Sequence, residues 1–124
     1  MVLEEISQLI EDCNEKREIL SEYRHKINQL QKDLLKVAAG RLNKDDLTDL
    51  EHYQNQFHIQ LINIHDVKHD LKIFQHQLKA EAHLHDSTSP EMIETHKSLT
   101  NAYDQLKTTL DGLQQQFEAF AGSH

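Results

Sequence analysis

The sequence predicts an all-α fold, an up-down-up antiparallel three-helix coiled-coil bundle with a protruding hairpin between its first two helices. Three observations predict it. Apolar residues recur every seventh position in three long stretches of the chain, and such rows form a narrow apolar seam on a helix. Only two short breaks, near 40–43 and 86–89, interrupt the pattern. With three glycines and one proline, the chain contains few helix-breaking residues.

The first helix is expected over about residues 2–39. Glu4 and Glu5 place negative charge in its first turn, where the helix dipole favours it. Gly40 is the residue type most common just after a helix end. Two apolar rows run along this helix: Ile6, Cys13, Leu20, Ile27 and Leu34, and beside them Val2, Leu9, Tyr23, Leu30 and Val37.

The second helix is expected over about residues 43–85, and the third over about 90–121. Asn43 is a favourable N-cap, and acidic residues follow it. Ser89 and Pro90 provide an N-cap and a proline at the first helical position. The main seam rows are Leu50, Phe57, Ile64, Leu71 and Leu78 in the second helix, and Met92, Leu99, Leu106, Leu113 and Phe120 in the third.

Both connections are only a few residues long, so consecutive helices should be antiparallel neighbours within one domain, residues 1–124. Folding the chain at each connection aligns the three seams in layers, such as Leu20 with Ile64 and Leu113. A few polar residues fall in or beside the seam, and we expect structural roles for them. The register predicts a hydrogen bond from the Gln60 amide to the Tyr23 hydroxyl, and it places His96 opposite Glu81. It lays Lys16 along the seam edge with its ammonium group in solvent.

The third helix is the shortest, and its last apolar residue, Phe120, should reach only the layer of Ile27 and Phe57. The first two helices continue for roughly 18 Å of helix rise beyond that layer. This overhang stays apolar, and Leu35 and Leu42 add to it. Closure of the hairpin on itself would bury part of the patch, but large apolar patches usually mark partner surfaces. We therefore expect a second copy of the chain to bind this surface and form a homodimer, or alternatively a helix of another protein to bind there. The residues of the expected interface are Leu30, Leu34, Val37, Leu47, Leu50 and Tyr53.

Ten histidines are present, and seven of them lie on the second predicted helix, where five form a stripe on the outer face: His58, His65, His69, His76 and His83. His65 and His69 are four residues apart, so both can reach one Zn²⁺ or Ni²⁺ from the same helical face. Two exposed ligands do not complete a zinc site, which has three or four protein ligands. The sequence therefore predicts no cofactor, with weak Zn or Ni binding at His65 and His69 as an alternative.

The net charge of −8 argues against nucleic-acid binding and against docking on anionic membranes. No apolar run approaches the roughly 20 residues that span a bilayer, and the N-terminus lacks the features of a signal peptide. The single cysteine, Cys13, cannot form a disulfide within one chain. These observations favour a cytoplasmic protein.

The sequence contains no glycine-rich phosphate loop, cysteine pair or nucleophile elbow. A narrow coiled-coil seam also leaves little room for a substrate pocket. We therefore expect a non-enzymatic helical interaction or scaffold module that acts through the apolar hairpin tip. The alternative is a divalent-metal-binding helical protein that uses the histidine-rich outer face of the second helix.

Overall fold

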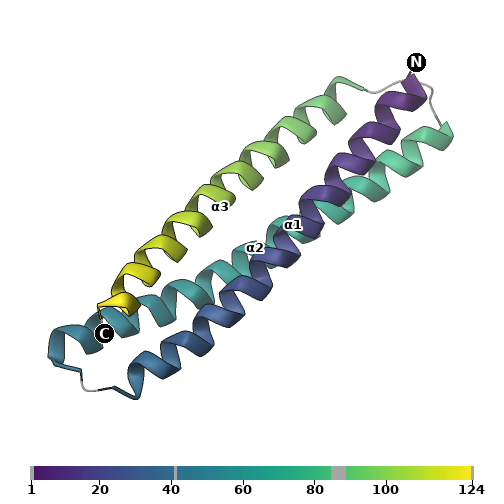
Figure 1. Cartoon of the computed structure of the whole chain (residues 1–124). Helices are drawn as coiled ribbons and strands as arrows, with labels where there is room; N and C mark the ends of the chain where they lie inside the picture. The colour runs from purple at the N-terminus through teal and green to yellow at the C-terminus, as the bar shows by residue number, and fades with distance from the viewer. Residues whose placement is uncertain (1, 41, 85–88, 124) are drawn as a thin grey trace.

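In the computed structural model, three long α-helices make up nearly all of the part of the chain that the structure describes (Figure 1). Helix α1 spans Val2–Ala38, α2 spans Lys44–Leu84 and α3 spans Pro90–Gly122. The structure describes residues 2–40, 42–84 and 89–123. The predicted end of the second helix at His85 and the break over 86–88 lie outside the described residues. Every other predicted helix end agrees with the structure to within one residue.

Side chains near the helix starts explain where α2 and α3 begin. The Asn43 side-chain oxygen accepts a hydrogen bond from the Asp46 amide at 2.8 Å, and the Asp46 carboxylate accepts one from the Asn43 amide at 3.1 Å. This reciprocal pair is a capping box, which satisfies two otherwise unpaired amides. The Ser89 hydroxyl accepts a hydrogen bond from the Met92 amide at 3.2 Å, directly before Pro90.

The end of α1 is a tight turn, in which the Gly40 amide donates to the Val37 carbonyl at 3.1 Å. Gly40 follows the helix as predicted, but its φ is not positive. The turn therefore does not use the left-handed conformation that often makes glycine favourable at this position.

The three helices run up, down and up, so that α2 is antiparallel to both of its neighbours in the chain (Figure 1). Helices α1 and α2 form the most extensive contact, and α3 packs against both. The end of α3 lies near the first turns of α2 (Figure 1). The predicted three-helix bundle is confirmed.

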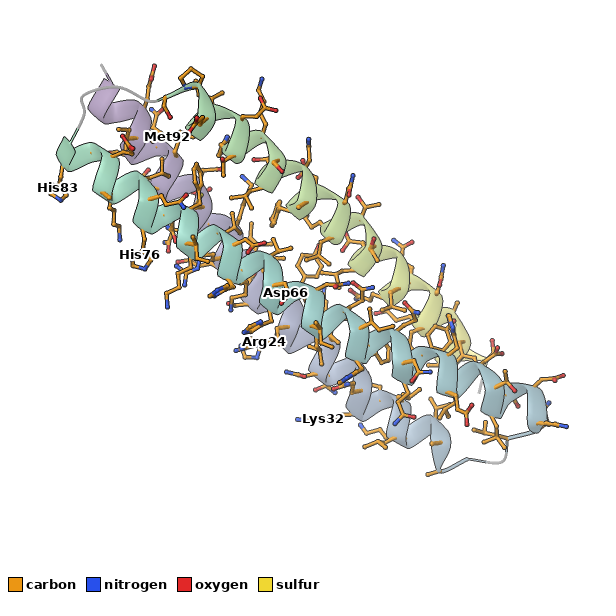
Figure 2. The ribbon with its side chains drawn as sticks, turned by 180° about the vertical axis from the view of Figure 1, so that it is seen from behind. Arg24, Lys32, Asp66, His76, His83 and Met92 are labelled. Carbon is orange, nitrogen blue, oxygen red and sulfur yellow. The ribbon has the colours of Figure 1, made fainter. Side chains whose placement is uncertain are left out.

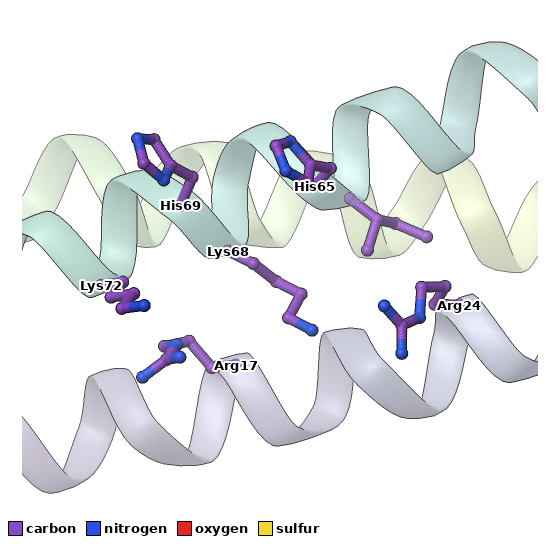
Figure 3. Close-up of a pocket in the computed structure, with 7 residues that line it drawn as sticks. Arg17, Arg24, His65, Lys68, His69 and Lys72 are labelled. Carbon is purple, nitrogen blue, oxygen red and sulfur yellow. The ribbon is translucent and has the colours of Figure 1, made fainter.

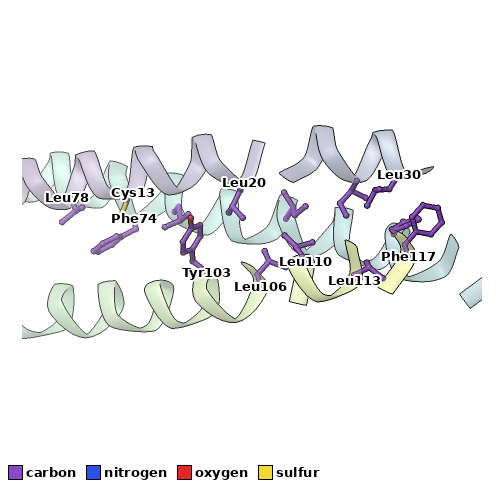
Figure 4. Packing of buried hydrophobic residues seen from close by; sticks show 14 of the residues in the cluster. Cys13, Leu20, Leu30, Phe74, Leu78, Tyr103, Leu106, Leu110, Leu113 and Phe117 are labelled. Carbon is purple, nitrogen blue, oxygen red and sulfur yellow. The ribbon is translucent and has the colours of Figure 1, made fainter. Parts of the chain in front are cut away.

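The predicted seams meet in one continuous core along the bundle axis (Figure 4). Its most deeply buried members include Cys13, Leu20, Phe57 and Ile64, whose side chains are fully shielded from solvent. Helix α3 contributes Phe117, which is also almost completely buried. The seven-residue pattern therefore identified the buried face of each helix.

The register of α3 differs from the prediction, which placed Phe117 level with Gln60 and Phe120 level with Phe57. Instead, the ring centres of Phe117 and Phe57 lie 5.2 Å apart, and so do those of Phe120 and Tyr53. Helix α3 therefore lies about one helical turn closer to the α1–α2 hairpin than predicted. The physical reason is that two apolar rows, three or four residues apart, remain matched after such a shift, while aromatic rings pack favourably in the observed register.

The shifted register also changes the partners of the polar seam residues. The Tyr23 hydroxyl donates to the Asp111 carboxylate of α3 at 2.7 Å, rather than to the Gln60 amide. The Gln60 carbonyl oxygen instead accepts a hydrogen bond from Asn63, one turn away on its own helix, at 3.2 Å. The predicted bond between Gln60 and Tyr23 is therefore wrong.

His96 contacts an acidic residue, but not the predicted one. Its Nε2 atom lies 2.9 Å from an oxygen of Asp12 on α1, where the predicted register placed Glu81 of α2 opposite this ring. Lys16, which was expected to extend its ammonium group into solvent, pairs with the same Asp12 oxygen. These three groups tie α1 to α3 on the outside of the core.

Candidate functional site

The α1–α2 hairpin extends beyond the C-terminal end of α3 (Figures 1 and 2), but less of its seam is uncovered than predicted. Leu30 and Leu34 are buried, with 5% and 4% of their surfaces exposed. Tyr53 lies against α3, and its hydroxyl donates to the Gln116 carbonyl at 3.2 Å. The prediction that the seam is uncovered is therefore wrong for Leu30, Leu34 and Tyr53. Helix α3 reaches one turn further than expected, and the hairpin itself encloses the α1 row.

A smaller apolar surface remains exposed at the hairpin. Leu47 is 51% exposed and Leu35 is 72% exposed, while Leu50 and Val37 are half-buried. A hollow of about 280 Å³ opens between Leu35 and Leu50, lined by Gln31, Leu34, Leu35, Ala38, Leu50 and Gln54. We call the exposed residues Leu35, Ala38 and Leu47, together with the half-buried Leu50, the tip patch.

The Asp12 carboxylate lies between Lys16 and His96, where α1 meets α3. Burial raises the pKa of Asp12, but hydrogen bonds from Lys16 and His96 and the charges of both groups outweigh it, so the pKa lies below its ordinary value. A carboxylate with a lowered pKa is a weak base, which suits a structural tie better than proton abstraction.

The adjacent thiol of Cys13 is buried in the core. Burial, followed by the charge of Asp12, raises the pKa of this thiol to about 11. The thiol is therefore protonated at neutral pH, and protonated thiols are poor nucleophiles and metal ligands.

His65 and His69 are exposed on α2, as predicted, and their rings are nearly parallel with centres 6.2 Å apart. Within the described part of the chain, no three histidine, cysteine, aspartate or glutamate residues gather as a potential metal site. The two rings instead lie on the rim of a groove between α1 and α2 (Figure 3). This groove has a volume of about 250 Å³ and is lined by Arg17, Arg24, Ile64, His65, Lys68, His69 and Lys72. We call it the cationic groove.

Lys68 crosses the cationic groove from α2 to α1, and its ammonium group donates to the Ser21 hydroxyl at 2.7 Å (Figure 3). Burial lowers the pKa of Lys68, and the like charges of Arg24 and Arg17 lower it further. The groove therefore brings together cations that repel one another.

Sequence reasoning identified the histidines of this groove but not its arginines. Arg17 and Arg24 lie seven residues apart beside the α1 seam, and the antiparallel contact places them along residues 65–72 of α2. Their spacing was a usable signal, because equal heptad positions lie on the same side of a helix.

No family model, curated protein or solved structure matches this chain. Among the described residues, no helix is long and apolar enough to cross a membrane.

Proposed function

We propose that this chain is a non-enzymatic helical interaction module that forms a homodimer through the tip patch. The observation that carries the proposal is the exposure of Leu35 and Leu47, which are 72% and 51% exposed beside a seam that is otherwise well buried. Burying such side chains stabilises an interface by about 1.5–3 kcal/mol for each one that is fully covered. Leu35 and Leu47 are the two most exposed large apolar side chains among the described residues, so covering the tip patch would favour association.

The charge distribution favours a second copy of the chain as the occupant. Residues 32–50 contain four basic and four acidic side chains, so the hairpin is neutral while the whole chain carries −8. Two hairpins can therefore approach each other without the repulsion that the acidic remainder of the chain would cause. The charged residues of this segment are Lys32, Asp33, Lys36, Arg41, Lys44, Asp45, Asp46 and Asp49.

The shape of the tip patch also suits a two-fold interface. Such an interface uses the same surface on both copies, so the surface must carry a projection and a matching recess. Leu47 projects, and the hollow beside Leu35 provides the recess. Two hairpins joined in this way would form a local four-helix bundle.

The other interpretations have less support. A helix of another protein could occupy the same hollow, but the neutral charge of the hairpin gives no preference for a particular foreign sequence. A divalent metal at His65 and His69 would lie beside Lys68 and Lys72, and these like charges weaken cation binding.

Sedimentation analysis of the full chain, at concentrations up to ~100 µM, tests the dimer. We expect a dimer for the natural chain and a monomer for Leu47→Glu, since the new carboxylate would be buried in the interface. The matched control is Ile93→Glu on α3, a residue 46% exposed and away from the tip patch, which should leave the dimer intact. A monomeric natural chain, or a dimer indifferent to Leu47→Glu, would overturn the proposal. Leu34→Glu would not test the interface, because Leu34 is buried and a charge there would destabilise the chain itself.

Spin labels can locate the interface, because Cys13 is fully buried and a thiol introduced on the surface should be labelled selectively. A label at Ala38→Cys should lie close to its equivalent in the second copy. A label at Ser98→Cys, on an exposed position of α3, should lie much further from its equivalent. The reverse order of distances would place the interface elsewhere and exclude the tip patch.

A further inference from the structure

The cationic groove concentrates positive charge on an acidic protein. Two arginines and two lysines line it, and none of its lining residues is acidic. In the part of the chain that the structure describes, no carboxylate forms an ion pair with any of these four cations. At the rim, an Asp66 oxygen lies 3.5 Å from His65 Nδ1. Among the described residues, the four charges therefore have no carboxylate in direct contact.

Arg17 is held in place by a buried amide. Its Nη1 atom donates to the Gln75 carbonyl oxygen at 2.8 Å, and Gln75 is only 6% exposed. The Gln75 nitrogen in turn donates to the Ile10 carbonyl at 3.0 Å. The Nε atom of Arg17 is buried and has no hydrogen-bond partner among the described residues. The guanidinium is therefore positioned before any ligand arrives, which reduces the entropic cost of binding.

The other cations extend the site along the helices. Lys68 lies between the two arginines, with its ammonium group fixed by Ser21 at 2.7 Å (Figure 3). Arg17 and Arg24 are seven residues apart, which corresponds to roughly 10 Å along α1. Holding these like charges together destabilises the empty groove, and an anion that bridges them would remove the repulsion.

We propose that the cationic groove binds a small polyanion that carries at least two phosphate groups. Guanidinium groups match phosphate oxygens in geometry, and lysines add charge without further shape requirements. Four positive charges, of which Arg17 and Lys68 are held by hydrogen bonds, exceed what one phosphate can neutralise, whereas a linked chain of phosphates can contact both ends of the groove. The volume of about 250 Å³ suits such a compact ligand. A nucleic acid is disfavoured, because its long backbone would also meet the acidic surfaces outside the groove.

This site is separate from the tip patch, since the two surfaces share no lining residue. Its ligand could therefore bind to a monomer or to a dimer. It also gives the exposed histidines a role other than metal coordination, because ring N–H groups at the rim can donate to phosphate oxygens.

Calorimetric titration of the full chain with inorganic tripolyphosphate tests the proposal. We expect one site per chain and weaker binding as the salt concentration rises. The double variant Arg24→Gln, Lys72→Gln removes two exposed cations of the groove and should bind at least about tenfold more weakly. Both positions are exposed, so the helical circular dichroism should be unchanged.

The control double variant Lys32→Gln, Lys97→Gln removes the same charge from exposed positions outside the groove. Its affinity should stay within about twofold of the natural chain, because distant exposed charges are screened. Equal weakening in both double variants would show diffuse attraction and overturn the proposal. So would the absence of binding at millimolar tripolyphosphate, equal affinity for sulfate, or tighter binding of single-stranded DNA.

Discussion

Phe57 and Leu50 occupy the same seam row of α2, one heptad apart, yet their environments differ. Phe57 is fully buried, and its ring centre lies 5.2 Å from that of Phe117 on α3. Leu50 is only half-buried and lies seven residues nearer the connection between α1 and α2. Equivalent positions of one heptad row therefore differ in burial, because Phe117 of the third helix covers Phe57.

The comparison shows why the tip patch is a candidate interface and the rest of the seam is not. Between three helices, most seam side chains, such as Leu20 and Ile64, are buried by the chain itself. At the hairpin, only two helices are available, and apolar surface such as that of Leu47 remains in contact with solvent. A second copy would supply the missing helices.

Truncating the two seam residues would test this difference most directly. Phe57→Ala should lower the free energy of unfolding by about 3–5 kcal/mol, because it leaves a cavity in the three-helix core. Leu50→Ala should cost only about 1–2 kcal/mol, since part of that side chain is already in water. Urea unfolding followed by circular dichroism at low protein concentration measures both. Equal losses would mean that Leu50 is as well enclosed as Phe57, contrary to the structure.

Filling a glycine position of α3 should have a smaller and opposite effect. A Cβ atom added at Gly112 meets no atom within 4 Å, and the residue lies inside a helix without a positive φ. Gly112→Ala should therefore raise the free energy of unfolding by about 0.5–1 kcal/mol. Gly122→Ala, at the last residue of the same helix, is the matched control and should change it less. A loss of stability at Gly112 would indicate that α3 packs more tightly than observed.

The smallest expected effect concerns the tie between α3 and α1. The pKa of Asp12 is below its ordinary value of 3.8 in the folded chain, so unfolding favours proton uptake by this carboxyl. Its stabilising contribution is therefore complete above about pH 4 and is lost as the pH falls through the lower folded value. Because the carboxyl is partly exposed, we expect Asp12→Asn to cost under about 1 kcal/mol at pH 7.

Comparing the unfolding free energies of the natural chain and Asp12→Asn between pH 2 and pH 7 measures this contribution. The two curves should converge at the acidic end. A difference that grows as the pH falls would contradict the roles of Lys16 and His96 as partners of the carboxylate.

The candidate sites were only partly predictable. The hairpin was recognisable from the sequence because the seam rows of α1 and α2 extend beyond the end of the α3 row. Its exposed members were harder to identify, since Leu34 and Leu47 are both apolar residues near the same loop but only Leu47 is exposed. Only the α2 side of the cationic groove was recognisable from the sequence, because its arginines and its lysines lie about 50 residues apart in the chain.

Local chemistry determined the helices and their inward faces: caps such as Asn43 and Ser89 act within one turn, and the heptad rows need no distant partner. The tertiary structure alone decided how far α3 slides along the other two helices. A shift of one turn exchanges one apolar row for the next at little cost in burial, so the pattern cannot distinguish the two registers. The shapes of Phe57, Phe117 and Tyr53 can distinguish them, because rings pack well in only a few arrangements.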